Sequence, residues 1–249
     1  MKPFLLATLS LSLAAVLLPL PAKAQVPSPK EIADLAVLHN DALAANRKIL
    51  ENYHWNYRIE VQEDNVLQWV DLVNIKMGAD GRPIFTQINR EQIVEKQRGL
   101  FRKSRKQEKG FEQKDRIVEY VSKWIIAYNR LPADRIHTLF RKAAESGAIR
   151  VSPRNPNLIG VSASNVRDSN ANDQLSLWLN KENGHPISFS FTVPVEPGIE
   201  GFGGEKLSAV INYRYLQNGE AFYPELVDVM IPSRNLQIKV ENVNIQKKP

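Results

Sequence analysis

The stretch Ile187-Ser188-Phe189-Ser190-Phe191-Thr192-Val193 alternates apolar and hydroxyl-bearing residues without a break. Successive side chains of a β-strand point to opposite faces of a sheet, so this pattern predicts a strand with one wholly apolar face. The same period-two alternation occurs in four stretches between Leu175 and Ile245, and short turn signals separate most of them. The last third of the chain is therefore predicted to form an antiparallel sheet with one apolar face.

The alternation changes phase close to the end of the chain. It is regular from Leu236 to Val240, whereas Val243 and Ile245 resume it one residue out of step, after Asn242. A single-residue β-bulge produces such a slip and bends the strand that contains it. The sheet is therefore expected to be strongly curved and to have an inside.

The N-terminal part of the chain shows the same alternation after a helix. Ser28-Pro29-Lys30-Glu31 has the form of a capping box with proline at the first helical position, which predicts a helix from there to about Asn52. The residues from Trp55 to Val61 then predict a strand, and Glu63-Asp64-Asn65 predicts a turn. The helix is expected to dock on the sheet through an apolar stripe of Ile32, Leu35, Leu38, Ala42, Ile49 and Leu50.

Two further strands complete this first group, and the spacing then becomes helical. One strand continues from Leu67 to Met77, interrupted by Asp71, and the other extends from Pro83 to Ile88. Helices are predicted at Arg90 to Lys109, Ile117 to Tyr128 and Ile136 to Ala143. Strands return at Ala148 to Val151 and Leu158 to Ser162. The order of helix, strands, helices and strands is that of an α+β fold.

The first residues have the pattern of an export signal. Lys2 precedes an apolar run from Phe4 to Leu18, two prolines follow, and Ala22-Lys23-Ala24 offers small residues for cleavage. The run is shorter than the roughly 20 residues that a membrane-spanning helix needs. Residues 1–24 are therefore expected to be a signal peptide cleaved near Ala24, and residues 25–249 are expected to form a single domain.

Composition limits how this domain is stabilised and what it binds. The chain has no cysteine, so neither a disulfide nor a lipid-modified cysteine is available. Positive charge is concentrated in a basic insertion within residues 90–146, where Arg90 to Arg116 holds ten Lys or Arg against five acidic residues. Two readings stay open for it: a solvated helix face, or a contact with anionic headgroups through Arg102, Lys103, Arg105 and Lys106. Nucleic acid is not expected as a partner outside the cytoplasm.

No residue pattern in the chain names a reaction. Its four histidines are far apart in sequence and none has the spacing of a metal ligand. There is also no Gly-x-Ser-x-Gly motif and no phosphate-binding glycine loop. No catalytic residue, metal or cofactor is therefore expected, and an unrecognised hydrolase with a triad assembled from distant residues is kept as an alternative.

The order of elements resembles that of the LolA/LolB-like periplasmic carriers. The stretches that carry the resemblance are Ile211-Asn212-Tyr213-Arg214-Tyr215, Phe222-Tyr223-Pro224 and the last strand from Leu236 to Val243. The resemblance implies an incomplete, strongly curved β-barrel that is covered by helices and shelters an apolar ligand. Members of the family carry the acyl chains of lipoproteins, bind lipids or act as envelope-stress sensors. None of their individual binding residues can be aligned to this chain.

The resulting prediction is a periplasmic carrier or sensor that binds lipid or lipoprotein acyl chains in a cavity between sheet and helices. The alternative is a non-catalytic envelope module with a filled core, whose basic helix docks on an acidic envelope protein. For any single aromatic residue, ordinary core packing is the competing explanation. The candidate cavity residues are Trp55, Trp69, Trp124, Ile125, Tyr128, Phe140, Phe189, Phe191, Ile211 and Tyr213.

Overall fold

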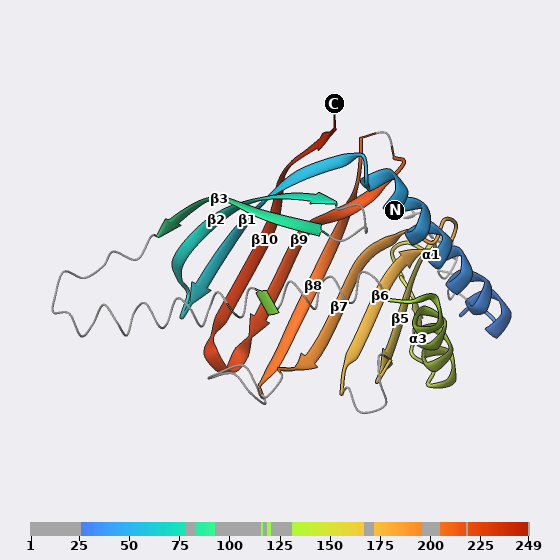
Figure 1. The fold of residues 1–249 in the computed structure, drawn as a ribbon. Helices are drawn as coiled ribbons and strands as arrows, with labels where there is room; N and C mark the ends of the chain where they lie inside the picture. Colours follow the sequence, from blue (N-terminus) through green and yellow to red (C-terminus); the bar gives the residue numbers. More distant parts are fainter. Residues whose placement is uncertain are drawn as a thin grey trace, which may run out of the picture.

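Ten strands of the described part of the chain form one open antiparallel sheet (Figure 1). The structure is a computed structural model, which describes residues 26–77, 83–92, 116, 119–120, 131–166, 172–195, 205–217 and 219–248. The strand order is β3-β2-β1-β10-β9-β8-β7-β6-β5-β4, and β3 and β4 are its two edges. Helix α3 packs on β5 and on α1, so both helices lie at the β5 end of the sheet (Figure 1). The predicted α+β class, with an open antiparallel sheet and helices against it, is confirmed.

The strands fall into two groups along the chain, separated by α3 (Ala133–Glu145). The first group follows α1 (Pro29–Leu50) and consists of β1 (Tyr53–Glu63), β2 (Val66–Met77) and β3 (Pro83–Gln92). The second consists of β4 (Ile149–Val151), β5 (Leu158–Ser164), β6 (Gln174–Asn180), β7 (Pro186–Pro194), β8 (Lys206–Tyr215), β9 (Phe222–Ile231) and β10 (Leu236–Lys247), with the short helix η1 (Pro232–Arg234) before β10.

Helix α1 begins at the predicted capping box, and its buried stripe agrees with the prediction at Ile32 and Leu35 but not at Leu38. The Ser28 amide donates to Glu31 Oε2 at 2.7 Å, and the Glu31 amide donates to Ser28 Oγ. Leu38 is 36% exposed, which contradicts its predicted place in the docking face. The reason is that the polar side chains of His39 and Asn46 occupy the buried face of α1, where both are hydrogen-bonded. The buried residues of α1 are Ile32, Leu35, Ala36, His39 and Asn46.

The first group of strands is longer than predicted. Asp64 and Asn65 have φ of 53° and 61°, so they form the two-residue turn that matches the twist of a hairpin. Strand β3 continues past Ile88, with Arg90 opposite Asp71 and Gln92 opposite Trp69. The prediction of a helix from Arg90 is therefore wrong for its first three residues, because cross-strand pairing with β2 holds them extended. Residues 93–109 of that predicted helix lie outside the described residues.

The second group contains one strand that the alternation did not reveal. This is β9, whose register against β8 shifts between Asn212 and Tyr213 and leaves Glu225 without an opposite residue, so its alternation is interrupted. The predicted bulge in β10 is confirmed. Asn244 pairs with Asn56 and Asn242 pairs with Tyr57, so Val243 is the extra residue. Each bulge shifts the alternation by one position and bends its strand.

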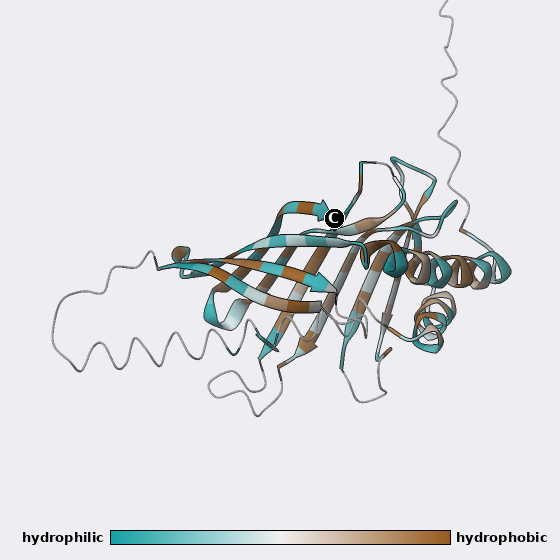
Figure 2. Cartoon of the chain, turned by 45° about the horizontal axis from the view of Figure 1, so that its top comes forward, coloured by the Kyte–Doolittle hydropathy of each residue, from teal (hydrophilic) through white to brown (hydrophobic). Residues whose placement is uncertain are grey.

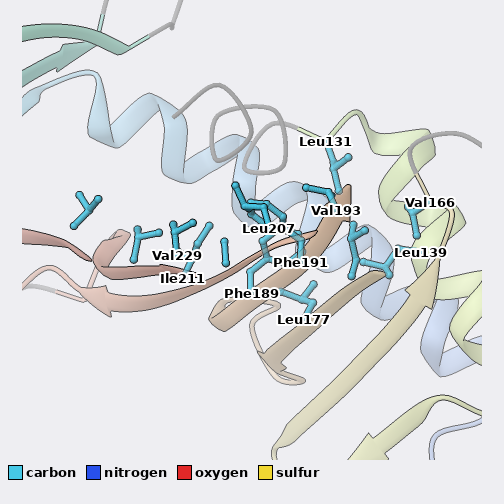
Figure 3. Close-up of a cluster of buried hydrophobic side chains, with 14 of the residues drawn as sticks. Leu131, Leu139, Val166, Leu177, Phe189, Phe191, Val193, Leu207, Ile211 and Val229 are labelled. Atoms are coloured by element: carbon cyan, nitrogen blue, oxygen red, sulfur yellow. The ribbon is translucent and has the colours of Figure 1, made fainter. Parts of the chain in front are cut away.

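One continuous cluster of buried apolar side chains covers the inner face of the sheet, from β2 to β4 in strand order. We use "inner face" for the face that carries Trp55, Phe189 and Ile211. Apolar and polar residues alternate along the strands (Figure 2). The inner-face residues Phe189, Phe191 and Ile211 are drawn with Leu131 and Leu139 in one packed group (Figure 3). The helical cover and the sheet therefore share a single hydrophobic core.

Candidate functional site

Six of the ten candidate cavity residues belong to this buried cluster, and a seventh packs against it. Trp55, Trp69, Phe140, Phe189, Phe191 and Ile211 are buried, and Tyr213 is partly buried. Phe189 lies opposite both Leu177 of β6 and Ile211 of β8, which aligns a row of apolar side chains across three strands. The remaining candidates, Trp124, Ile125 and Tyr128, lie outside the described residues. So do the four basic residues Arg102, Lys103, Arg105 and Lys106.

A small cavity separates the two helices from the inner face. Its volume is about 30 Å³, which is the space of roughly one water molecule. Of the candidate residues, only Phe189 and Tyr213 line it. The complete lining is His39, Leu43, Leu131, Ile136, Leu139, Leu177, Pro186, Phe189 and Tyr213. This cavity is apolar apart from His39 and the Tyr213 hydroxyl.

Two polar side chains of α1 attach the helix to distant parts of the sheet. His39 Nδ1 lies 2.6 Å from the carbonyl oxygen of Gly184, so the Nδ1–H donates. Burial lowers the pKa of His39, against the opposing effect of this hydrogen bond. Asn46 binds both backbone groups of Phe222: Nδ2 donates to its carbonyl oxygen at 2.9 Å, and Oδ1 accepts from its amide at 2.8 Å. These contacts fix α1 over the ends of the strands.

An ion pair interrupts the apolar inner face on the β2–β3 side. Arg90 Nε and Nη2 donate to the two carboxylate oxygens of Asp71, each at 2.6 Å. The guanidinium carbon also lies 5.3 Å from the centroid of the Trp69 ring, within the range of a cation–π contact. The alternation of the sequence places Asp71 at an inward position of β2. The signal missed in the sequence is that Arg90, on the next strand, can pair with Asp71.

A second polar group on the inner face is formed by β1, β8 and β10. Tyr57 is directly opposite Asn242, and besides burial Tyr57 contributes electrostatically to the raised pKa of Tyr213 on β8. Burial raises the pKa of both tyrosines. The nitrogen atoms Trp55 Nε1 and Asn242 Nδ2 are buried, and no described residue accepts a hydrogen bond from them. Asn242 continues the inward positions Leu236, Ile238 and Val240, and this phase is the signal that would have identified it.

The outer face has a different chemistry. A groove of about 700 Å³, open to solvent, lies over β5, β6, β7 and the C-terminal end of α3. Ser162 and Ser176 are hydrogen-bonded in it at 2.9 Å, and Ser164, Ser190 and Thr192 also line it. Within the described residues, no group of three or more His, Cys, Asp or Glu has the arrangement of a metal site. None of the helices described is long and apolar enough to cross a bilayer.

No family model matches this chain, and no curated protein sequence is significantly similar to it. Three solved structures are similar over most of its length. A DUF1329 family protein from Desulfovibrio piger has a TM-score of 0.41 at 7% identity, covering 88% of this chain and 92% of that protein. A LolA superfamily protein from Nitrosomonas europaea has a TM-score of 0.37 at 10% identity, covering 85% and 94%. A putative outer membrane lipoprotein-sorting protein domain from Vibrio parahaemolyticus has a TM-score of 0.33 at 7% identity, covering 84% and 93%. Two of these descriptions name the group that the order of elements in the sequence resembles.

Proposed function

We propose that this protein is a periplasmic carrier or sensor that holds the acyl chains of a lipid or lipoprotein between the sheet and its helices. The observation that carries the proposal is the single apolar cluster, which extends over the inner face from β2 to β4. Each methylene group moved from water onto such a surface gains about 0.8 kcal/mol. An acyl chain therefore binds firmly there without any catalytic group.

The size of the cavity sets a condition on this function. A space of about 30 Å³ does not admit an acyl chain, so α1 and α3 must move away from the inner face when a ligand enters. On its inner side α1 is attached by the His39–Gly184 and Asn46–Phe222 hydrogen bonds. A ligand shifts the protein to the open state only by binding that state more tightly than the closed one.

The same small cavity favours the second candidate, an envelope interaction module with a filled core. The two proposals assign different roles to the basic residues Arg102, Lys103, Arg105 and Lys106. In the carrier these residues contact anionic headgroups, and in the module they dock on an acidic protein surface. The module binds no apolar ligand, which separates the two proposals experimentally.

The periplasm is the proposed location for either function. Its support is the N-terminal pattern of Lys2, the apolar run to Leu18 and the small residues before Gln25. Cleavage near Ala24 stays a prediction, because residues 1–25 lie outside the described residues. N-terminal sequencing of protein recovered from the periplasm measures the cleavage site directly.

Lipid extraction is the direct test. The full chain is expressed in a bacterial host and isolated without detergent, and its organic extract is analysed by mass spectrometry. The carrier is expected to release acyl lipid in an amount comparable to the protein. It is also expected to change its tryptophan fluorescence on titration with 1-palmitoyl-lysophosphatidylcholine. An extract without lipid and an unchanged fluorescence would contradict the carrier and support the filled module.

The opening of the helices is measured with spin labels, which the absence of cysteine makes simple. Leu38→Cys on α1 and Gln174→Cys on β6 place one label on the helix and one on the sheet. Their distance is expected to increase when the lysophospholipid is added. The control pair, Gln174→Cys with Val210→Cys, lies within the sheet and is expected to keep its distance.

A further inference from the structure

Among the described residues, the buried inner-face donors Trp55 Nε1 and Asn242 Nδ2 have no acceptor within hydrogen-bonding distance. Trp55 is only 7% exposed, so its indole is not solvated as a surface tryptophan would be. Burying an N–H without a partner costs free energy, and folded proteins keep few such groups. Unpaired polar atoms next to an apolar space indicate a partner that the protein itself does not supply.

Trp55 and Asn242 are both neighbours of Tyr57. Trp55 and Tyr57 are successive inward residues of β1, and Asn242 lies directly opposite Tyr57 on β10. Residues that are opposite each other on antiparallel strands have Cβ atoms about 5 Å apart. The rings of Trp55 and Tyr57 meet edge to face with their centroids 6.5 Å apart. The Trp55 indole N–H has no acceptor in hydrogen-bond geometry among the described residues, while burial raises the pKa of Tyr57 against the opposing effect of a polar contact with Trp55.

This donor cluster, Trp55, Tyr57 and Asn242, adjoins the cavity under the helices. Tyr213 lines the cavity from β8, which one strand, β9, separates from Asn242 on β10, and besides burial Tyr57 contributes to the raised pKa of Tyr213. Tyr57 and Tyr213 are only partly buried, whereas the nitrogen atoms Trp55 Nε1 and Asn242 Nδ2 are fully buried. A ligand chain that enters at Phe189 when the helices move away can extend along the inner face toward the cluster.

The chemistry of the cluster selects the kind of polar group. An indole N–H, a phenol and an amide N–H donate hydrogen bonds, so they fit an acceptor oxygen. All three side chains are neutral, and a buried carboxylate or phosphate requires a compensating charge. A neutral carbonyl oxygen meets both requirements. The Asp71–Arg90 pair is a different case, because its charges already neutralise each other.

We propose that Trp55, Tyr57 and Asn242 bind the carbonyl oxygen of an acyl ester or amide, whose hydrocarbon chain lies along the inner face toward Phe189. This inference rests on the proposed function and adds the group by which the ligand is positioned. It predicts that the protein distinguishes an acyl chain from an alkyl chain of equal length. A carrier that recognised hydrocarbon alone would not make this distinction.

The test compares two ligands that differ only in the carbonyl group. 1-Palmitoyl-lysophosphatidylcholine has an ester, and 1-O-hexadecyl-lysophosphatidylcholine has an ether in its place. Below their micellar concentrations, the full-length protein is expected to bind the ester about tenfold more tightly, the effect of one hydrogen bond to a buried donor. In Trp55→Phe, Tyr57→Phe and Asn242→Leu the ratio of the two dissociation constants is expected to fall toward one. The control Trp178→Phe makes the same indole deletion on the outer face, opposite Ser188, and is expected to keep the ratio.

The possible outcomes separate this inference from the proposed function. Equal binding of both ligands by the unmodified protein would overturn the carbonyl site and leave the carrier intact. Binding of neither ligand would overturn the carrier and the carbonyl site together. Urea unfolding gives a second readout, because donors without a protein partner are not needed for folding. Asn242→Leu is expected to keep the wild-type unfolding midpoint, and a clear loss would assign its amide to structure instead.

Discussion

His39 Nδ1 and the carbonyl oxygen of Gly184 are 2.6 Å apart, which joins the middle of α1 to the turn between β6 and β7. The two residues are 145 positions apart in the sequence. Because the carbonyl oxygen accepts, the neutral imidazole carries its proton on Nδ1. The contact therefore requires a proton on Nδ1 and the absence of a side chain at Gly184.

The first prediction concerns pH. Burial lowers the pKa of His39 in the folded protein below its usual value of 6.5. The unfolded chain consequently binds more protons than the folded one as the pH falls below about 6.5. The contribution of His39 to the free energy of unfolding is expected to be constant above that pH. Below it, the free energy of unfolding is expected to decrease by at most about 1.4 kcal/mol per pH unit for one proton.

Urea unfolding at pH 7.5, 6.5 and 5.5 measures this effect. Burial also lowers the pKa of His185, which adds a contribution of the same sign. In His39→Gln the decrease with falling pH is expected to be smaller than in the unmodified protein. His137→Gln is the control for loss of an exposed histidine on α3. An identical pH dependence in His39→Gln and the unmodified protein would contradict the assignment to His39.

The second prediction concerns the glycine of the same contact. A Cβ at Gly184 would lie 2.7 Å from the His39 amide nitrogen and 2.8 Å from the Leu38 carbonyl, and φ there is +69°. Both neighbours are helix backbone and cannot rotate away. Gly184→Ala is expected to cost about 2–4 kcal/mol of unfolding free energy and to loosen α1. The control Gly147→Ala has φ +66° with no atom within 4 Å, so only backbone strain of about 1–2 kcal/mol is expected. Equal losses in the two variants would show that α1 does not pack on this turn.

Alternation and capping in the sequence were sufficient to predict most elements of the fold. The Ser28 capping box, the turn at Asp64 and the phase slip after Asn242 all report local conformation, and the structure agrees with each. His39 and Asn46 were not predicted to be buried. Their polarity is compensated by Gly184 and Phe222, which are 145 and 176 residues away, and a single sequence does not show which distant groups will pair.

The same limitation applies to the candidate site. Its apolar side was predictable, because inward positions of amphipathic strands carry the aromatic residues Trp55 and Phe189. Its polar side was not, because the roles of Tyr57 and Asn242 depend on the register between β1 and β10. These strands are consecutive in the sheet and lie at opposite ends of the domain sequence. Register across that separation is fixed by the assembled core.

The third prediction uses the attachment of Asn46. Asn46→Leu leaves the buried amide and carbonyl of Phe222 without partners, and is expected to cost about 2–4 kcal/mol of unfolding free energy. The control Asn52→Leu removes an exposed side chain with one weak contact, at 3.5 Å, and is expected to change stability by less than about 0.5 kcal/mol. Urea unfolding measures both.

Asn46→Leu also tests whether α1 moves. If the lipid-binding state has α1 released, weakening its attachment increases the population of that state and lowers the apparent dissociation constant. Titration with 1-palmitoyl-lysophosphatidylcholine is therefore expected to show tighter binding in Asn46→Leu and unchanged binding in Asn52→Leu. Weaker binding in Asn46→Leu would place the ligand in contact with the docked helix.

The fourth prediction concerns the ion pair on the inner face. The side chains of Asp71 and Arg90 are 6% and 27% exposed, so Arg90→Met leaves a buried carboxylate without its counter-charge. This substitution is expected to cost about 3 kcal/mol of unfolding free energy. Adding Asp71→Leu removes the carboxylate as well and is expected to recover most of that loss, since an apolar pair of similar volume replaces a buried ion pair at little cost. The comparison is made by urea unfolding of the two single variants and the double variant. If the double variant is as unstable as the sum of the single ones, Asp71 and Arg90 stabilise the sheet through separate contacts and not as a pair.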